Sequence, residues 1–295
     1  MRQRVITGIL FTLGVALFMG PGIRWPWIPT ILLVFVSIMT VQELLNAAEA
    51  GGLKMVRWPI FIGSLTFLLP LLLKLTSDVI ALDAWNGAAA ALALSLSVLL
   101  GLMMMNLIIP LIKTGPEQLM SVAAGSLIMA YTAFPLTCSV LLLYYVPLGW
   151  YWLVLALIAP WASDVAAYFT GSAIGRHHIL PKISPKKTLE GCLGGLAGTV
   201  IVLVLYAEFV LIRVTEVRPD MLMHLLFALI GGVVLSLASQ LGDWLASVIK
   251  RRVGIKDFGK LLPGHGGILD RFDSAFFTMP ITLLLAILYW QFFQI

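Results

Sequence analysis

Long apolar runs dominate this sequence of 295 residues, and they restrict its fold more than any other feature. Each run has about the 20 residues that an α-helix needs to cross the hydrocarbon core of a bilayer. We expect nine such helices, at residues 4–20, 27–49, 58–76, 86–112, 119–145, 149–175, 188–213, 221–249 and 269–293. Helices are expected because backbone groups in lipid must be paired within their own segment or in a closed barrel. The alternating pattern of a β-barrel is absent, so the fold class is all-α and polytopic.

The composition excludes a water-soluble globular protein. Hydrophobic residues make up 60% of the chain and charged residues 11%, whereas a soluble domain has about 25% charged residues. The chain therefore lacks the polar groups that would cover a soluble surface. We expect an integral membrane protein whose surroundings are the lipid bilayer, and we expect no nucleic acid partner.

Lys and Arg residues are distributed unevenly between the loops that connect the nine spans. One side of the membrane receives 14 of the 19, the other side receives 4, and Arg271 lies just inside the last span. Cytoplasmic loops carry an excess of Lys and Arg, so we expect the N-terminus in the cytoplasm and the C-terminus outside, in the plasma membrane. The two long basic loops, at residues 176–187 and 250–268, then face the cytoplasm.

Charge also divides the chain into two halves. Residues 1–148 form apolar helices that we interpret as a scaffold, and residues 149–295 carry most of the polar chemistry. Glycines at helical spacing, in Gly171 to Gly175 and in Gly194 to Gly198, permit helices to pack closely. The apolar first half and these small-residue faces are compatible with a homodimer. We assign no role in the site to three acidic residues near span ends, Glu43, Glu49 and Glu208.

Three carboxylates lie in or next to the last two apolar segments, at Asp243, Asp270 and Asp273. A charged side chain within a bilayer loses its hydration, so carboxylates at such positions indicate a polar functional site. Asp270 and Asp273, three residues apart, share a face of the last helix near one membrane surface. Asp243 shares a helix face with three residues at helical spacing, Ser247, Lys250 and Arg251.

The loop between these segments, with the sequence Pro-Gly-His-Gly-Gly at 263–267, contains too much glycine to be helical. Its backbone at Gly266 and Gly267 can approach an anion closely. A polyphosphate with Mg²⁺ fits this arrangement, because Mg²⁺ needs a few carboxylate oxygens and leaves room for phosphate oxygens. Asp243 and Asp270 are the candidate metal ligands, and Asp273 is the third. The cations that would neutralise phosphate charge are Lys250, Arg251, Lys256, His265 and Arg271.

Two alternatives to a phosphate site remain open. The first is a structural ion-pair cluster, in which Asp270 pairs with Arg271 and Asp243 pairs with Lys250. The glycine-rich loop argues against it, because a packing cluster does not require such a loop. The second is a cation-coupled transporter, which typically has internal repeats and ion sites near the middle of the bilayer. The sequence has no such repeat, and its carboxylates cluster near one membrane face.

A second polar group lies between Ser163 and Gly191. Asp164 belongs to the sixth span, and the basic loop after it ends in Ser-Pro-Lys-Lys-Thr at 184–188. Thr188 is expected to cap the seventh helix. Lys186 and Lys187 would then lie beside a helix N-terminus, which favours anions. The alternative is that these lysines only determine topology.

The residues from Ser247 to Asp273 read S-x-I-K-R-x4-K-D-x-G-x2-L-P-x-H-G-G-I-x-D-R-F-D. This run resembles the signature of the phosphatidate cytidylyltransferases, also called CDP-diacylglycerol synthases. The segments 239–243, 164–168 and 184–188 also resemble that family, whereas residues 1–150 resemble it only in hydropathy. One departure is Ala246, at a position where the family pattern leads us to expect Glu.

The resemblance implies that CTP and phosphatidic acid react to give CDP-diacylglycerol and pyrophosphate, with Mg²⁺ as the cofactor. The catalytic residues would be Asp243, Asp270, Asp273, Lys250 and Arg271. The substrates would be bound by Asp164, Lys186, Lys187, Ser247, Arg251, Lys256, His265, Gly266 and Gly267. The site would open to the cytoplasm for CTP and sideways to the bilayer for the lipid. A lipid or polyprenol kinase, which transfers the γ-phosphoryl group instead, is a further alternative.

Overall fold

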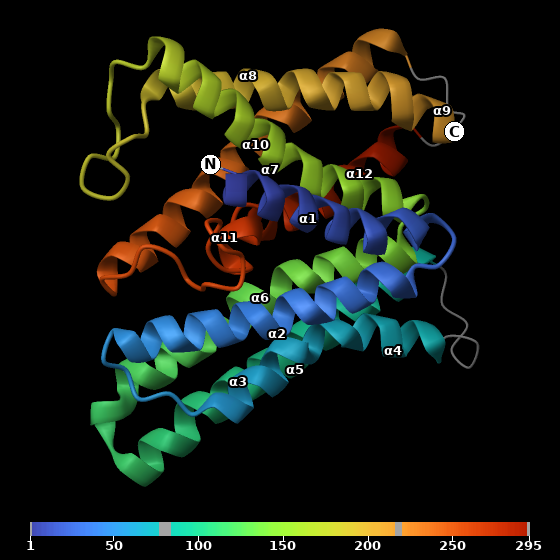
Figure 1. The fold of residues 1–295 in the computed structure, drawn as a ribbon. Coiled ribbons are helices and arrows are strands. Elements are labelled where there is room, and N and C mark those ends of the chain that lie inside the picture. The colour runs from blue at the N-terminus through green and yellow to red at the C-terminus, as the bar shows by residue number, and fades with distance from the viewer. Residues whose placement is uncertain (1, 77–83, 216–219, 294–295) are drawn as a thin grey trace. The chain divides into compact units, whose positions relative to one another are not determined.

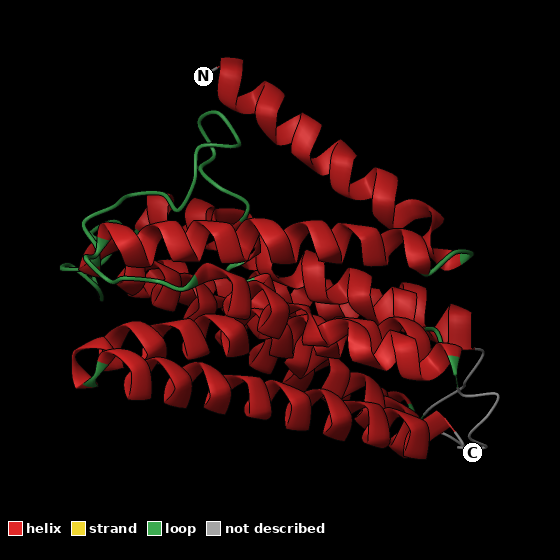
Figure 2. Ribbon diagram, turned by 90° about the horizontal axis from the view of Figure 1, so that it is seen from below, coloured by secondary structure: helices red, strands yellow, loops and turns green. Residues whose placement is uncertain are grey.

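The computed structural model describes residues 2–76, 84–215 and 220–293. Every named element in these ranges is a helix, and loops connect the helices (Figure 2). Within the described residues, nine helical segments are long and apolar enough to cross a membrane: Ile6–Ile23, Trp27–Ala50, Arg57–Leu75, Asn86–Thr114, Pro116–Tyr145, Gly149–Ile174, Leu189–Thr215, Met221–Arg252 and Leu269–Phe293. These segments match the nine predicted spans closely. The prediction of an all-α, polytopic membrane protein is therefore confirmed.

The chain divides into two compact units. The first unit contains Met1–Tyr145 and Ile249–Phe272, and the second contains Val146–Val248 and Asp273–Ile295. Most of the predicted signature segment thus groups with the N-terminal helices, whereas Asp243 and Asp273 belong to the second unit. The assignment of a scaffold role to residues 1–148 and a catalytic role to 149–295 stays a prediction.

The first unit is built around one buried helix. Its helices are α1 (Arg2–Met19), α2 (Trp27–Ala50), α3 (Arg57–Ser64), α4 (Leu69–Leu75), α5 (Ala84–Thr114), α6 (Leu119–Tyr145) and α11 (Leu269–Phe272), with the 3₁₀ turns η1 (Gly20–Ile23), η2 (Leu65–Leu68) and η3 (Pro116–Gln118). α2, α3 and α5 all pack on α6 (Figure 1). Polar side chains support this packing: Asn106 Nδ2 of α5 donates to the Val122 carbonyl oxygen of α6 at 3.0 Å. Such bonds and close packing hold helices together in lipid, which is as apolar as the side chains themselves.

Proline affects the third and fifth spans differently. The third span is not one α-helix, because the turn η2 separates α3 from α4. Pro70 is at the second position of α4 and has no N–H to donate, while Thr66 Oγ1 donates to the Gly63 carbonyl oxygen at 2.8 Å. In the fifth span, α6 continues past Pro135, and Ser139 Oγ donates to the Pro135 carbonyl oxygen at 3.1 Å. Hydroxyl groups also donate to backbone carbonyl oxygens in both spans.

The second unit has a closely packed helix pair. Its helices are α7 (Gly149–Ile174), α8 (Leu189–Tyr206), α9 (Ile212–Thr215), α10 (Met221–Arg252, up to Val248) and α12 (Ala275–Phe293), with a π-helical turn, η4 (Ala207–Leu211). α7 and α8 lie side by side (Figure 1). A Cβ atom at Gly194 would lie 2.2 Å from Thr170 Oγ1, and one at Gly198 would lie 2.4 Å from the Cβ of Ala166. The predicted packing role of these two glycines is therefore confirmed.

Candidate active site

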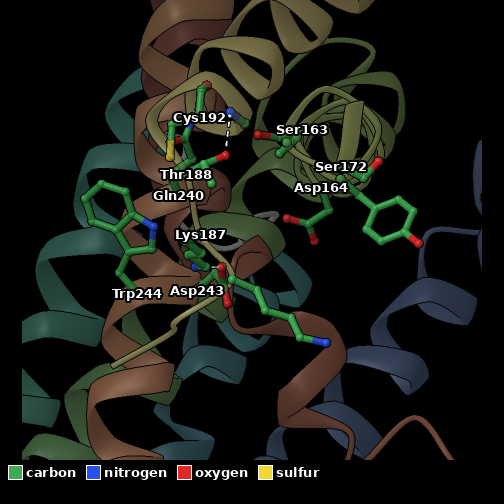
Figure 3. Close-up of a pocket in the computed structure, with 14 residues that line it drawn as sticks. Ser163, Asp164, Ser172, Lys187, Thr188, Cys192, Gln240, Asp243 and Trp244 are labelled. Carbon is green, nitrogen blue, oxygen red and sulfur yellow. Dashed lines mark hydrogen bonds and ion pairs between the residues drawn. The ribbon is translucent and has the colours of Figure 1, made fainter. Parts of the chain in front are cut away.

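A pocket of about 390 Å³ lies in the second unit, between α7, the start of α8 and α10 (Figure 3). Asp164 extends into it from α7, and Asp243 and Trp244 line it from α10. The remaining polar or charged lining residues are Ser163, Tyr168, Ser172, Lys186, Lys187, Thr188, Cys192 and Gln240. Lys187 and Asp243, which are more than 50 residues apart in the sequence, therefore meet in one cavity, whereas Asp270 and the glycine-rich loop do not line it.

An ion pair between Lys187 and Asp243 joins the two sides of this pocket. Lys187 Nζ donates to Asp243 Oδ2, and the two side chains are 21% and 31% exposed. The same Nζ lies 5.9 Å from the centroid of the Trp244 ring. The carboxylate and the ammonium group are thus both reachable by a ligand. The ion-pair interpretation paired Asp243 with Lys250, and the structure gives it Lys187 instead.

The loop that carries the two lysines is fixed where α8 begins. Thr188 Oγ1 accepts a hydrogen bond from the Gly191 N–H at 3.2 Å, which confirms the predicted N-cap. The Leu189 N–H donates to the His177 carbonyl oxygen at 2.8 Å. Glu190, in the first turn, accepts from the Arg176 N–H at 3.0 Å and from the His177 N–H at 3.2 Å. These bonds close the loop on itself and direct Lys186 and Lys187 into the pocket.

In the first unit, Asp270 organises the loop of the signature segment. Its Oδ2 accepts from the Phe258 N–H at 2.8 Å and from the Gly267 N–H at 2.9 Å. Its Oδ1 accepts from Lys250 Nζ at 2.7 Å, and the two side chains are only 4% and 12% exposed. The ion-pair interpretation paired Asp270 with Arg271, but its partner is Lys250. Asp270 and Lys250, two of the five predicted catalytic residues, therefore lie in direct contact.

Glycine is needed where this loop turns back on Asp270. Gly266 has a φ of +85°, a conformation that residues with a Cβ atom rarely adopt. A Cβ atom there would also lie 2.6 Å from Asp270 Oδ2. The turn is closed by the Leu262 N–H, which donates to the Gly266 carbonyl oxygen at 2.9 Å. The loop is not helical, as predicted, and its glycines let the backbone approach a carboxylate of the protein itself.

The other predicted residues of the first unit have more varied surroundings. Arg251 Nη1 donates to the Ile255 carbonyl oxygen at 3.2 Å, and Lys256 is exposed. The His265 ring lies against α1, where a Cβ atom at Gly8 would be 3.4 Å from its Cε1. Arg271 Nε is a buried donor with no hydrogen-bond partner among the described residues.

Ser247 and Asp273 are buried residues of the second unit, 9% and 8% exposed. Asp273 Oδ1 accepts from the Ser274 N–H at 2.7 Å. A Cβ atom at Gly242 would lie 2.7 Å from the Asp273 carbonyl oxygen. The backbone of Asp273 therefore packs directly against the residue that precedes Asp243. Asp270 belongs to the first unit, so a metal shared by Asp243 and Asp270 stays a prediction.

A family model described as "Cytidylyltransferase family" matches residues 2–289, nearly the whole chain. The chain belongs to this family. The phosphatidate cytidylyltransferase of Staphylococcus haemolyticus is 40% identical over 139 residues, which are 47% of this chain and 50% of the relative. Proteins of the same name from Staphylococcus epidermidis and Staphylococcus aureus are 40% and 42% identical over the same length. The chain spans about half the length of the curated relatives it matches.

Aspartate carboxylates are the side chains of this cytidylyltransferase family member that could contribute ligands to Mg²⁺, and this cofactor stays a prediction. Within each unit, the described residues contain no group of three His, Cys, Asp or Glu side chains that could hold a metal. A structural Zn²⁺ site, which needs four protein ligands, does not fit them. Mg²⁺ takes one or two carboxylates and fills its other positions with water and substrate phosphate oxygens. The partly exposed carboxylate of Asp243 can supply such an oxygen.

Two residues with clear structural roles were not identified from the sequence. Gln240 Nε2 donates to the Cys192 carbonyl oxygen and to Ser236 Oγ, both at 3.1 Å, and so ties α10 to α8 beside the pocket. Its signal was an amide in an apolar helix, one turn before Asp243. Glu43, which we left out of the site, is buried in α2 and accepts hydrogen bonds from the signature loop. Its signal was a carboxylate within a largely apolar span.

Proposed function

We propose that the protein transfers the cytidylyl group of CTP to phosphatidic acid and releases pyrophosphate, giving CDP-diacylglycerol. The pocket in which Lys187 meets Asp243 beside the N-terminus of α8 carries this proposal. Family membership and relatives named phosphatidate cytidylyltransferase support it. A phosphate ligand would be bound there by cations and by a helix N-terminus, both of which favour anions.

The reaction is a displacement at phosphorus. An oxygen of the lipid phosphate attacks the α-phosphorus of CTP, and a new P–O bond forms. The bond from the α-phosphorus to the oxygen that bridges it to the β-phosphorus breaks, and pyrophosphate leaves with that oxygen. Lys186 and Lys187 neutralise phosphate charge in the pocket, and catalytic roles for Lys250 and Arg271 belong to the same proposal. The protein acts mainly by positioning and by charge stabilisation, as is usual in such transfers.

The same proposal includes Mg²⁺. Asp243 and Asp270 would hold the ion, with Asp273 as the third carboxylate. The ion would supply positive charge that orients the triphosphate and stabilises the leaving pyrophosphate. Lys187 and Lys250 fix the orientation of the two aspartates through their ion pairs.

We also propose that the site faces the cytoplasm, in the plasma membrane, and that phosphatidic acid enters from the bilayer. The basic residues of the loops at 176–187 and 250–268 support this orientation. The pocket has Ala167 and Tyr168 of α7 in its lining, and the Tyr168 side chain is exposed. Such a wall is suited to a ligand that is partly apolar. A homodimer remains part of the proposal, on the basis of the apolar first half.

The test is an assay of the purified protein in lipid, with phosphatidic acid, Mg²⁺ and CTP labelled separately at the α- and γ-phosphorus. We expect the lipid to be labelled from α-labelled CTP, and labelled pyrophosphate to be released from γ-labelled CTP. Removal of Mg²⁺ with EDTA should abolish both products, and added Mg²⁺ should restore them. Lipid labelled from the γ-position would instead indicate a kinase, and label in neither product would contradict any nucleotide transfer.

A further inference from the structure

Glu43 of α2 is a buried carboxylate whose hydrogen-bond partners come from the signature loop. Its side chain is 4% exposed. Its Oε1 accepts from the Ile268 N–H at 2.9 Å, and its Oε2 accepts from the Leu269 N–H at 2.8 Å. No ion pair among the described residues involves Glu43. A buried carboxylate is costly unless it is well hydrogen-bonded, so the two backbone donors are what makes this position tolerable.

Two glycines of the loop are shaped around Glu43. A Cβ atom at Gly267 would lie 2.2 Å from Glu43 Oε1 and 2.5 Å from its Cδ. A Cβ atom at Gly259 would lie 2.3 Å from the same oxygen. Both glycines lie near the carboxylate without a side chain in between, so the loop wraps closely around it. Neither has a positive φ, so the contact with Glu43 is the physical reason for glycine at both positions.

Glu43 and Asp270 together hold three consecutive backbone N–H groups. The Gly267 N–H donates to Asp270, whereas the next two, of Ile268 and Leu269, donate to Glu43. Asp270 is in turn paired with Lys250. The orientation of the backbone that carries Asp270 therefore depends on Glu43, although Glu43 comes more than 200 residues earlier in the chain.

We propose that Glu43 is a positioning residue for the transfer reaction. It touches no substrate; it holds the signature loop so that Asp270 and Lys250 are in place. This inference rests on the proposed function, since that function gives Asp270 and Lys250 their roles. A mutation far from the chemistry that slightly misplaces the reacting groups can cost about 100-fold in rate. Loss of this anchor should therefore lower turnover as well as stability.

The variant Glu43→Gln tests the proposal. An amide has one acceptor oxygen in place of two and turns its NH₂ group toward a backbone N–H, so one bond is lost and two donors face each other. We expect kcat per folded molecule to fall about 10- to 100-fold. The fraction of folded protein would be measured by size-exclusion chromatography in detergent. We also expect trypsin to cleave after Lys256 and Lys260 faster than in the wild type.

The matched control is Glu49→Gln. Glu49 lies on the same helix, but its carboxylate pairs with Arg57 at 2.5 Å and has no bond to the loop. A partly exposed pair of this kind contributes little, so kcat and the rate of trypsin cleavage should stay within about two-fold of the wild type. If Glu43→Gln reduces only the yield of folded protein and leaves kcat per folded molecule unchanged, Glu43 is merely structural and the proposal is overturned.

A second pair of variants keeps the proposal testable if Glu43→Gln fails to fold. Gly267→Ala places a methyl group where the Glu43 carboxylate lies and should reproduce the loss of turnover and the faster cleavage. In the Glu43→Ala background the same methyl group has space, so the effects of the two substitutions should be far from additive. Additive effects would contradict the anchor. Trypsin cleavage of the loop can be measured without CTP or phosphatidic acid, so it tests the anchor independently of the reaction. A wild-type protein that makes no CDP-diacylglycerol would reject the proposed function but not the anchor.

Discussion

Lys187 and Asp243 are the residues through which the polar loop after α7 contacts α10. Both are partly exposed, so the pair is stabilised less by its Coulomb attraction than a buried pair would be. The ammonium group and the carboxylate are both within reach of a ligand. A phosphate–Mg²⁺ ligand could compete for both members of the pair. Substitution of Lys187 can therefore separate a role in binding from a role in topology.

Lys187→Ala should lower kcat/KM for CTP by about 100-fold, a loss typical for removal of one charge-stabilising group from a transfer site. The matched control is Lys182→Ala in the same loop, because Lys182 is exposed and outside the pocket. It removes the same charge from the same side of the membrane and should change kcat/KM less than three-fold, roughly the scatter expected for a surface site. Equal losses in both variants would mean that the loop acts through topology alone.

Local patterns made Lys187, Asp243, Lys250 and Asp270 candidates for the site, and their roles stay predictions. The aspartates stood out because charge in an apolar context is costly, and the lysines stood out by their position beside a helix N-terminus or at helical spacing from Asp243. The ion-pair partners were not predicted correctly, because Asp243 pairs with Lys187 and Asp270 pairs with Lys250. Partner choice depends on how helices far apart in sequence pack together. For the same reason Glu43 was set aside, since its two bonds reach residues that no local pattern connects to it.

At the scale of elements, the packing of α7 against α8 holds the walls of the pocket together. Gly194→Ala would place a Cβ atom 2.2 Å from Thr170 Oγ1, and the two helices would have to move apart. Overpacking of this kind costs about 1–3 kcal/mol, so the thermal unfolding midpoint in detergent should fall. Gly101→Ala in α5 is the control, because no atom lies within 4 Å of the Cβ position there. An unchanged midpoint for Gly194→Ala would show that the α7–α8 contact is not rigid.

The helices themselves were largely predictable, because length and hydropathy decide a membrane span. The nine predicted ranges match nine described segments closely. What hydropathy could not predict is the internal geometry of a span. Pro70 coincides with a break between α3 and α4, whereas α6 continues past Pro135. The difference depends on how neighbouring helices pack around each proline, and that is tertiary information.

At the scale of the whole molecule, the chain groups with its N-terminal helices again from the last turn of α10 onward. The residues from Ile249 to Phe272 group with Met1–Tyr145 and not with the helices that flank them in sequence. A boundary near residue 148, drawn from composition, could not anticipate this, because composition reports charge along the chain and not contacts. A consequence is that the N-terminal helices do more than contact lipid: α2 carries Glu43, and α1 contacts His265.

The charge distribution over nine spans predicts the orientation of the whole chain, with the loop at 250–268 in the cytoplasm and the C-terminus outside. In a chain with Cys138 and Cys192 replaced by Ala, a cysteine appended after Ile295 should react with a membrane-impermeant maleimide on intact cells. A cysteine in place of the exposed Lys260 should react only after the cells are permeabilised. The opposite pattern would invert the molecule and place the proposed CTP site where no nucleotide is supplied. A single span is predicted between Lys260 and the C-terminus, so equal labelling of both cysteines on intact cells would contradict that span. Either result would place the loop at 250–268 outside the cell and would contradict the proposed cytoplasmic site.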